Sequence, residues 1–176
     1  CILKQGEPTV DIRSGLFHRS TKNILSMQNG VLHINEGSFY KKQTVEATSS
    51  DKILASAVYM NNGSLSLKNA KFFIEGNYTN GIYSTVNTDI PGNSFTVTDT
   101  SFTMTNGNNQ IGICTEQGMV QLNSTSGSNS KITLNGTDSV GILAENGGSV
   151  AAKSYDILLR DKNSIGIMST SGSVDM

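Results

Sequence analysis

The chain is built around one short pattern that returns along its whole length. Its clearest copy is SVGILAENGGSV at residues 139–150, in which an apolar alternation leads to an Asn-Gly corner and a second apolar alternation. Residues 163–174 repeat it closely, residues 110–120 repeat it again, and residues 57–65 and 23–32 are looser copies. Self-similarity at this period is the signature of stacked repeat architectures, so a solenoid is the first fold to test.

Glycines at the corners mark the repeat units. They are separated by 24 to 33 residues and are Gly6, Gly30, Gly63, Gly92, Gly118, Gly148 and Gly172. The extra residues fall in polar stretches such as 41–51 and 85–91, where loops can leave a stack without disturbing its strands. We therefore predict one β-helical segment over residues 1–176, less regular over 1–51 and most regular over 52–176.

Each unit carries three short segments with the period-two alternation of strands. The column before the corner is aliphatic in every unit: Leu25, Val58, Ile82, Ile113, Ile142 and Ile167. The position two residues earlier, expected to face inward as well, is apolar only in the C-terminal half: Asn23, Ser56, Asn80, Ile111, Val140 and Ile165. Apolar pairs after the corner run from Val10/Ile12 to Val174/Met176, and a third set runs from Phe39 through Phe72/Ile74 to Ile157/Leu159.

Three strands per unit predict an all-β fold, a right-handed parallel β-helix (β-solenoid) of about seven irregular coils of 24–33 residues. The glycine column at Gly81, Gly112, Gly141 and Gly166 is expected to point outward at a bend. Asn-Gly at 29–30, 62–63 and 146–147 is expected to supply the positive φ of the opposite corner. These are structural roles rather than ligand-binding roles.

The aliphatic columns, the Gly-Ile strands and the Asn-Gly corners resemble passenger segments of bacterial autotransporters, the type V secreted proteins. The resemblance is to large adhesin-like passengers with irregular β-helical repeats. It implies an adhesive or structural segment of a virulence-related protein, at the bacterial cell surface, associated with the outer membrane, or secreted. It also implies a secretion signal upstream, further β-helix coils, and a C-terminal membrane β-barrel outside this sequence. A host or bacterial surface protein or glycan would be the partner.

A carbohydrate-active enzyme, such as a polysaccharide lyase or a glycosidase, is the alternative for a chain of this fold. Such enzymes need carboxylates that converge on one face. The outward positions between the post-corner pairs are Asp11, His33, Ser66, Thr96, Gln121, Ala151 and Asp175, and no two adjacent coils carry acids there. We therefore expect no catalytic residues and no enzymatic activity, and an acidic cluster on neighbouring coils would favour the alternative.

Other ligand classes find little support in the sequence. The formal net charge of −1 offers no basic footprint for nucleic acid, and no apolar run is long enough to span a membrane. His18 and His33 have no third partner in register, so neither a metal nor a cofactor site is expected. Cys1 and Cys114 should lie four coils apart, about 19 Å at the spacing of parallel strands, which is too far for a disulfide. Cys114 is therefore predicted to be a free thiol.

One outward column is semi-apolar in five successive coils: Tyr59, Tyr83, Cys114, Leu143 and Met168. It follows Ser26 of the preceding coil. Two interpretations are open. The column can be in-register stacking covered by a loop, or it can be an exposed apolar stripe that contacts a partner. These five residues are the candidate interaction site.

Overall fold

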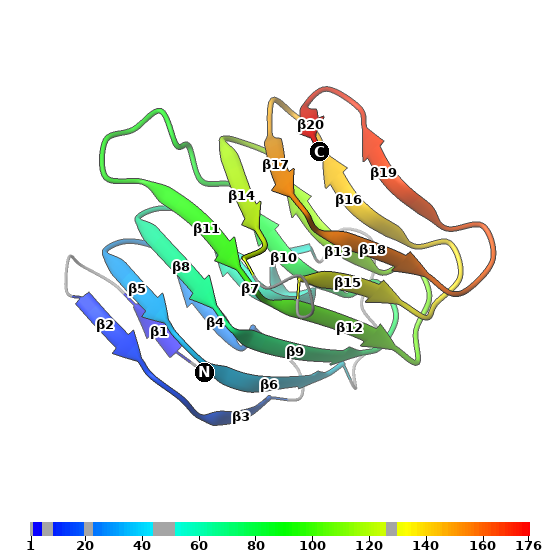
Figure 1. Cartoon of the computed structure of the whole chain (residues 1–176), viewed down its shortest axis with the longest axis horizontal. Helices are drawn as coiled ribbons and strands as arrows, with labels where there is room; N and C mark the ends of the chain where they lie inside the picture. Colours follow the sequence, from blue (N-terminus) through cyan, green and yellow to red (C-terminus); the bar gives the residue numbers. More distant parts are fainter. Residues whose placement is uncertain (1, 5–8, 20–22, 44–51, 126–129) are drawn as a thin grey trace.

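The computed structural model describes residues 2–4, 9–19, 23–43, 52–125 and 130–176, and in them the chain winds through three parallel sheets (Figure 1). Sheet A contains, in spatial order, β1 (Ile2–Lys4), β4 (Leu25–Met27), β7 (Ser56–Met60), β10 (Asn80–Ser84), β13 (Ile111–Thr115), β16 (Val140–Ala144) and β19 (Ile165–Ser169). Sheet B contains β2 (Thr9–Ile12), β5 (Val31–Ile34), β8 (Ser64–Lys68), β11 (Ser94–Thr98), β14 (Met119–Asn123), β17 (Ser149–Lys153) and β20 (Ser173–Asp175). Sheet C contains β3 (Leu16–Arg19), β6 (Gly37–Lys42), β9 (Ala70–Glu75), β12 (Ser101–Thr105), β15 (Lys131–Leu134) and β18 (Asp156–Leu159). One short helix, α1 (Lys52–Ala55), precedes β7.

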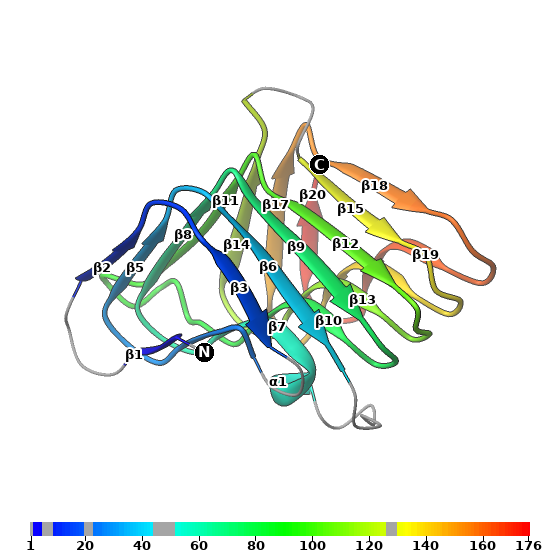
Figure 2. The ribbon, with the colours of Figure 1, turned by 90° about the horizontal axis from the view of Figure 1, so that it is seen from below.

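This architecture is the predicted right-handed parallel β-helix. Successive strands visit sheets A, B and C in turn, and each strand pairs in parallel with its counterpart in the next coil (Figure 2). The register confirms the aliphatic column, because Val58 pairs with Ile82, Ile82 with Ile113, and Ile113 with Ile142. Like residues therefore stack on like residues, which is how coils that cannot bury their own apolar side form a joint core.

The core runs along the axis between the three sheets. Its clearest feature is a ladder of phenylalanine rings from sheet C, in which Phe17, Phe39, Phe72 and Phe102 stack with centroids 4.7–4.9 Å apart. This spacing is the distance between neighbouring strands, so strand pairing sets the ring packing. The aliphatic side chains of sheets A and B close around the ladder, and Leu65, Val97 and Ile113 are fully buried.

Sheet A departs from the predicted alternation at the position two residues before the aliphatic column, which was expected to face inward. Ile111 and Val140 do not face the core; they pack against the outer group of Tyr83, Cys114 and Leu143. The amides of Asn23 and Asn80 also bond on this outer side, to backbone carbonyls of α1 and β7. The prediction of a second inward position was therefore wrong.

The glycine column takes the inward position instead, which corrects the expectation that it points outward. A Cβ on Gly112 would lie 2.4 Å from Cγ2 of the core residue Ile132, and one on Gly81 would lie 3.0 Å from the ring of Phe102. In β10, β13 and β16 the glycine and the aliphatic residue that follows it thus both face the core, and side chains of sheet C leave no room for a Cβ at Gly81, Gly112 or Gly141. An added Cβ at Gly166 in β19 would contact nothing within 4 Å.

The Asn-Gly corners behave as predicted. Gly30, Gly63 and Gly147 have φ of 85°, 92° and 86°, in the region that glycine adopts without strain. At Gly63 the coils also approach closely, since an added Cβ would lie 2.4 Å from the carbonyl oxygen of Gly30. The first predicted corner, Gly6, lies outside the described residues.

The first predicted insertion, residues 41–51, begins later than expected, because Lys41 and Lys42 belong to β6 and Lys41 is buried at an inward position opposite Ile74. Residues 44–51 lie outside the described residues, and α1 follows them at Lys52. The second insertion, after β10, projects from the stack before β11 at the upper left of Figure 1.

Candidate functional site

The five residues of the candidate stripe stand in register on the outer face of sheet A. Tyr59 pairs with Tyr83, Tyr83 with Cys114, Cys114 with Leu143, and Leu143 with Met168. The two tyrosine rings stack with centroids 5.8 Å apart. The predicted alignment of this column is therefore present.

The middle of the stripe is covered and its C-terminal end is open. Tyr83, Cys114 and Leu143 are buried, Tyr59 is half-buried, and Met168 is 38% exposed. Ile111 and Val140 widen the apolar group at the N-terminal ends of the same strands. The buried part has the form of stacking beneath a cover, whereas contact of the open end with a partner stays a prediction.

Helix α1 helps to cover the buried part of the stripe. Polar side chains of sheet A anchor the helix there. The Asn80 amide donates to the carbonyl of Lys52 at 3.1 Å, and the Asn23 amide donates to the carbonyl of Ile53 at 2.5 Å. Because Asn23 and Asn80 come from the outward column that was expected to face the core, their polarity has a structural reason. They hold the helix against sheet A.

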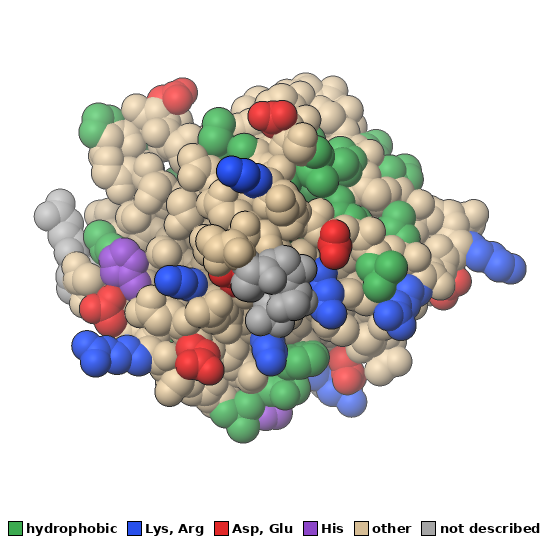
Figure 3. Space-filling model, in the orientation of Figure 1, with side chains coloured by type: hydrophobic (Ala, Val, Ile, Leu, Met, Phe, Trp, Pro, Cys, Tyr) green, Lys and Arg blue, Asp and Glu red, His purple; other side chains and the backbone are tan. Residues whose placement is uncertain are grey.

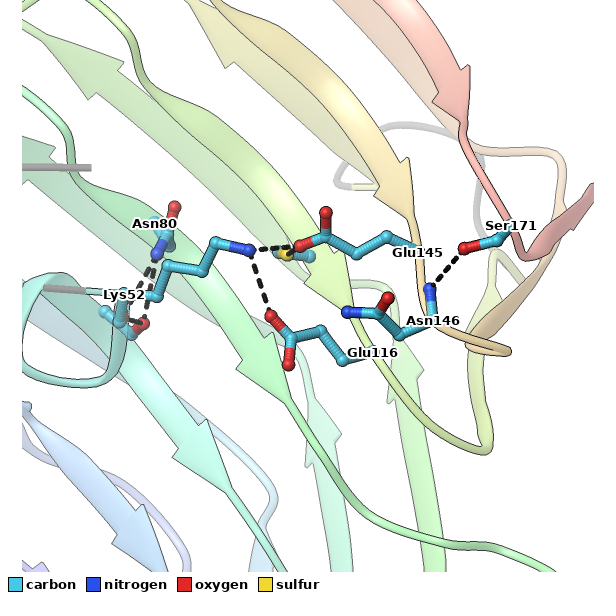
Figure 4. A network of polar contacts seen from close by, with 8 residues as sticks. Lys52, Asn80, Glu116, Glu145, Asn146 and Ser171 are labelled. Carbon is cyan, nitrogen blue, oxygen red and sulfur yellow. Dashed lines mark hydrogen bonds and ion pairs between the residues drawn. The ribbon is translucent and has the colours of Figure 1, made fainter. Parts of the chain in front are cut away.

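The Lys52 side chain then extends across two coils and ends between two carboxylates (Figure 4). Its ammonium group lies 2.9 Å from Glu116 and is also ion-paired with Glu145. The same nitrogen lies 6.0 Å from the centroid of the Tyr83 ring. We call the trio Lys52, Glu116 and Glu145 the lysine latch.

The two acids of the latch form the pair on neighbouring coils that the sequence analysis did not find. Each follows the last residue of a sheet A strand, and those residues, Thr115 and Ala144, pair with each other. Neither glutamate lies at the outward positions of sheet B, where such a pair was expected for an enzyme. The signal was present in the sequence, since both glutamates come three residues after the aliphatic column.

Burial and pairing set the electrostatics of the latch. Burial alone would lower the pKa of Lys52, but the hydrogen bonds to Glu145 and Glu116 outweigh it and raise that pKa above its ordinary value. Burial likewise opposes ionisation of Glu116, yet hydrogen bonds from Lys52 and Tyr83 lower its pKa below the ordinary value. Lys52 and Glu116 therefore form a charged ion pair at neutral pH.

Cys114 lies directly under this network. It is a free cysteine with no exposed surface, and its sulfur lies 3.6 Å from the Glu145 carboxylate. Burial and then the negative charge of Glu145 raise the pKa of the Cys114 thiol to about 12. A thiol with so high a pKa is a poor nucleophile at neutral pH. Cys1, which was predicted to lie too far from Cys114 for a disulfide, is outside the described residues.

The remaining polar candidates take up structural positions. Asp99 has φ of 48° and accepts hydrogen bonds from the backbone and hydroxyl of Thr125. His33 lies in β5 next to Asp11 and Ser66 of the flanking coils. Within the described residues, no three His, Cys, Asp or Glu side chains gather in a metal-binding arrangement.

The fold defines the protein as a parallel β-helix with a covered stack on one outer face. No family model, curated protein or solved structure significantly matches this chain. Among the described helices, none has the length and apolar character required to cross a bilayer.

Proposed function

We propose that this chain is a structural and adhesive segment of a bacterial surface-exposed or secreted protein, of the autotransporter passenger type. The observation that carries the proposal is the continuity of its outer faces. Side chains on each sheet align in register from coil to coil, which makes long flat surfaces suited to contact with a partner. This β-helix would act as a stalk that presents those surfaces.

The distribution of surface groups supports this role. Charged residues of both signs are scattered over the face seen in Figure 3, whereas hydrophobic side chains gather toward the C-terminal coils. Ile167 continues the core column in β19 and is nevertheless 41% exposed. In this proposal a further coil of a passenger would cover that end, because apolar patches of this kind mark contacts.

The test is adhesion by the purified chain. Beads coated with the folded chain should adhere to cultured epithelial cells or to bacterial cells well above beads coated with albumin. Beads coated with the same chain after irreversible heat denaturation serve as the matched control. Adhesion that does not depend on the fold, or none to any of these surfaces, would contradict the proposal.

The enzyme alternative is favoured by one specific observation, the Glu116–Glu145 pair on adjacent coils. Against it, Lys52 is ion-paired with both acids and helps to close the face that a substrate would have to reach. Incubation with neutral and acidic polysaccharides, followed by an assay of new reducing ends, separates the two functions. We expect no turnover, and product formation that is lost in Glu145→Gln would establish the alternative.

A further inference from the structure

The outer face of sheet C carries a second aromatic stack, on the opposite side of its strands from the core ladder. His18 lies 4.7 Å from Tyr40, and Tyr40 lies 4.8 Å from Phe73, with each pair of rings nearly parallel. The three residues come from β3, β6 and β9, which lie side by side in Figure 2. His18 is exposed, while Tyr40 and Phe73 are half-buried.

This outer stack stops one coil earlier than the core ladder beneath it. In β12 the core position is Phe102, which continues the inner ladder, but the outer position opposite Phe73 is Thr103. A threonine is too small to cover a phenyl ring. One face of Phe73 packs on Tyr40, and the place where the next ring would stand holds only the Thr103 side chain.

A cavity of about 540 Å³ opens along this stack and reaches the interrupted position. His18, Tyr40, Phe73 and Thr103 form one row of its lining, and Lys42, Glu75 and Thr105 form the row two residues further along each strand. The buried Lys41, between Tyr40 and Lys42 in β6, completes the lining. The cavity therefore follows the helix axis over four coils, or about 14 Å at the inter-strand spacing. Its volume is within the range of small-ligand sites.

The second row supplies polar groups with balanced charge. Lys42 and Glu75 form an ion pair at 3.6 Å, and both side chains are open to solvent. Thr103 and Thr105 add hydroxyl groups, which can donate or accept hydrogen bonds. The lining thus combines an apolar aromatic wall with a rim of donors and acceptors.

We propose that this cavity binds a neutral carbohydrate, with a sugar ring packed against Phe73 in the place left empty at Thr103. The inference deepens the proposed adhesive function, on which it rests, by naming the ligand class. A pyranose has an apolar face of C–H groups and a rim of hydroxyls, which matches the two rows of the cavity. An aromatic side chain of a protein partner would fill the same space but would form no hydrogen bonds with the hydroxyl groups of Thr103 and Thr105, which a sugar can engage.

Saturation-transfer NMR on the purified chain tests the site, with methyl glycosides of glucose, galactose and N-acetylglucosamine as probes. We expect a transfer signal from at least one glycoside, strongest at the protons of one ring face. Thr103→Phe adds the missing ring and should reduce the signal at least tenfold while the melting temperature stays the same or rises. Phe73→Leu, which keeps an apolar side chain of similar volume, should also lose the signal.

Leu158→Phe is the matched control. Leu158 occupies the same outer column two coils beyond Thr103, outside the cavity, so the added ring should leave the signal unchanged. The proposal is overturned if no glycoside gives a signal, or if the signal persists in Thr103→Phe. It is overturned equally if methyl glucuronide, or the peptide Gly-Phe-Gly, gives a stronger signal than every neutral sugar.

The bead assay and the NMR assay can fail independently. Adhesion without a sugar signal would remove this site and leave the adhesive function in place. A sugar signal that Thr103→Phe abolishes, together with beads that do not adhere, would remove the adhesive function and leave the carbohydrate site.

Discussion

Sheets A and C each carry a stack of large side chains on their outer face, but only one of the two stacks is buried. On sheet A, Tyr83, Cys114 and Leu143 lie beneath the lysine latch, whereas on sheet C the stack of His18, Tyr40 and Phe73 lines an open cavity. Parallel pairing in register aligns side chains on every face of a β-helix, so alignment does not distinguish the two surfaces. The difference comes from the insertion that ends in α1, which brings Lys52 across sheet A.

Both stacks rest on the same core, and breaking that core should have the largest effect. Ile113→Asp beneath sheet A and Ile132→Asp beneath sheet C each place a carboxylate where no side-chain surface is exposed. Each should lower the free energy of unfolding by about 3 kcal/mol or more. Asn123→Asp, in a half-buried position at the end of β14, should change it little. Urea denaturation provides the measurement, and equal effects of all three substitutions would invalidate the column assignment.

Substituting one tyrosine in each outer stack allows a direct comparison of the two stacks. Tyr83→Ala removes a buried ring from the covered stack, and we expect a loss of about 3 kcal/mol in unfolding free energy. Tyr40→Ala removes a half-buried ring from the open stack and should cost about 1 kcal/mol. Measured by the same denaturation experiment, equal losses would mean that α1 does not bury the sheet A stack in solution.

Two lysines allow the same comparison for ion pairs. Lys52→Ala leaves Glu116 and Glu145 unpaired on adjacent coils and should cost about 1–2 kcal/mol. Lys42→Ala breaks an exposed pair with Glu75 and should change stability by less than about 0.5 kcal/mol.

The Cys114 thiol reports on opening of the cover. In the native chain at pH 8 it should react slowly with an alkylating reagent, because it is buried and its pKa is raised to about 12. Lys52→Ala should accelerate alkylation of Cys114 at least tenfold, and Lys42→Ala should not. Mass spectrometry of the peptide that contains Cys114 measures the rate, and unchanged alkylation in Lys52→Ala would show that the latch does not hold the cover closed.

The smallest expected effect is the pH dependence of the latch. The folded-state pKa of Glu116 lies below its ordinary value of 4.5, so its contribution to stability is present above that value and is lost as pH falls through the folded pKa. The folded-state pKa of Lys52 lies above 10.5, so its contribution is present below 10.5 and is lost as pH rises through the folded pKa.

The difference in unfolding free energy between the native chain and Lys52→Ala should therefore be constant from pH 5 to 9 and shrink on further acidification. Denaturation curves over pH 3–9 measure it. A difference that grows toward acidic pH would contradict the assignment of Glu116 as a charged partner of Lys52.

The sequence by itself determined the repeat, and with it most of the fold. The aliphatic column from Leu25 to Ile167, the corner glycines with positive φ and the three strands per coil could all be predicted, because each depends on residues close together in one coil. The alignment of Tyr59, Tyr83, Cys114, Leu143 and Met168 followed for the same reason. Stacking one coil on the next needs no information beyond the common register.

Only the tertiary structure decided which groups face inward at the start of sheet A and which outer stack is covered. Gly112 faces the core, and Ile111 is displaced outward, because Ile132 of sheet C already fills the space inside. Lys52 and Glu145 are separated by 93 positions along the chain, so no local pattern could predict their contact. Helix α1 and the Lys52 side chain that crosses the neighbouring coils are placed by long-range packing and charge, and that placement covers the stack on sheet A while the stack on sheet C stays open.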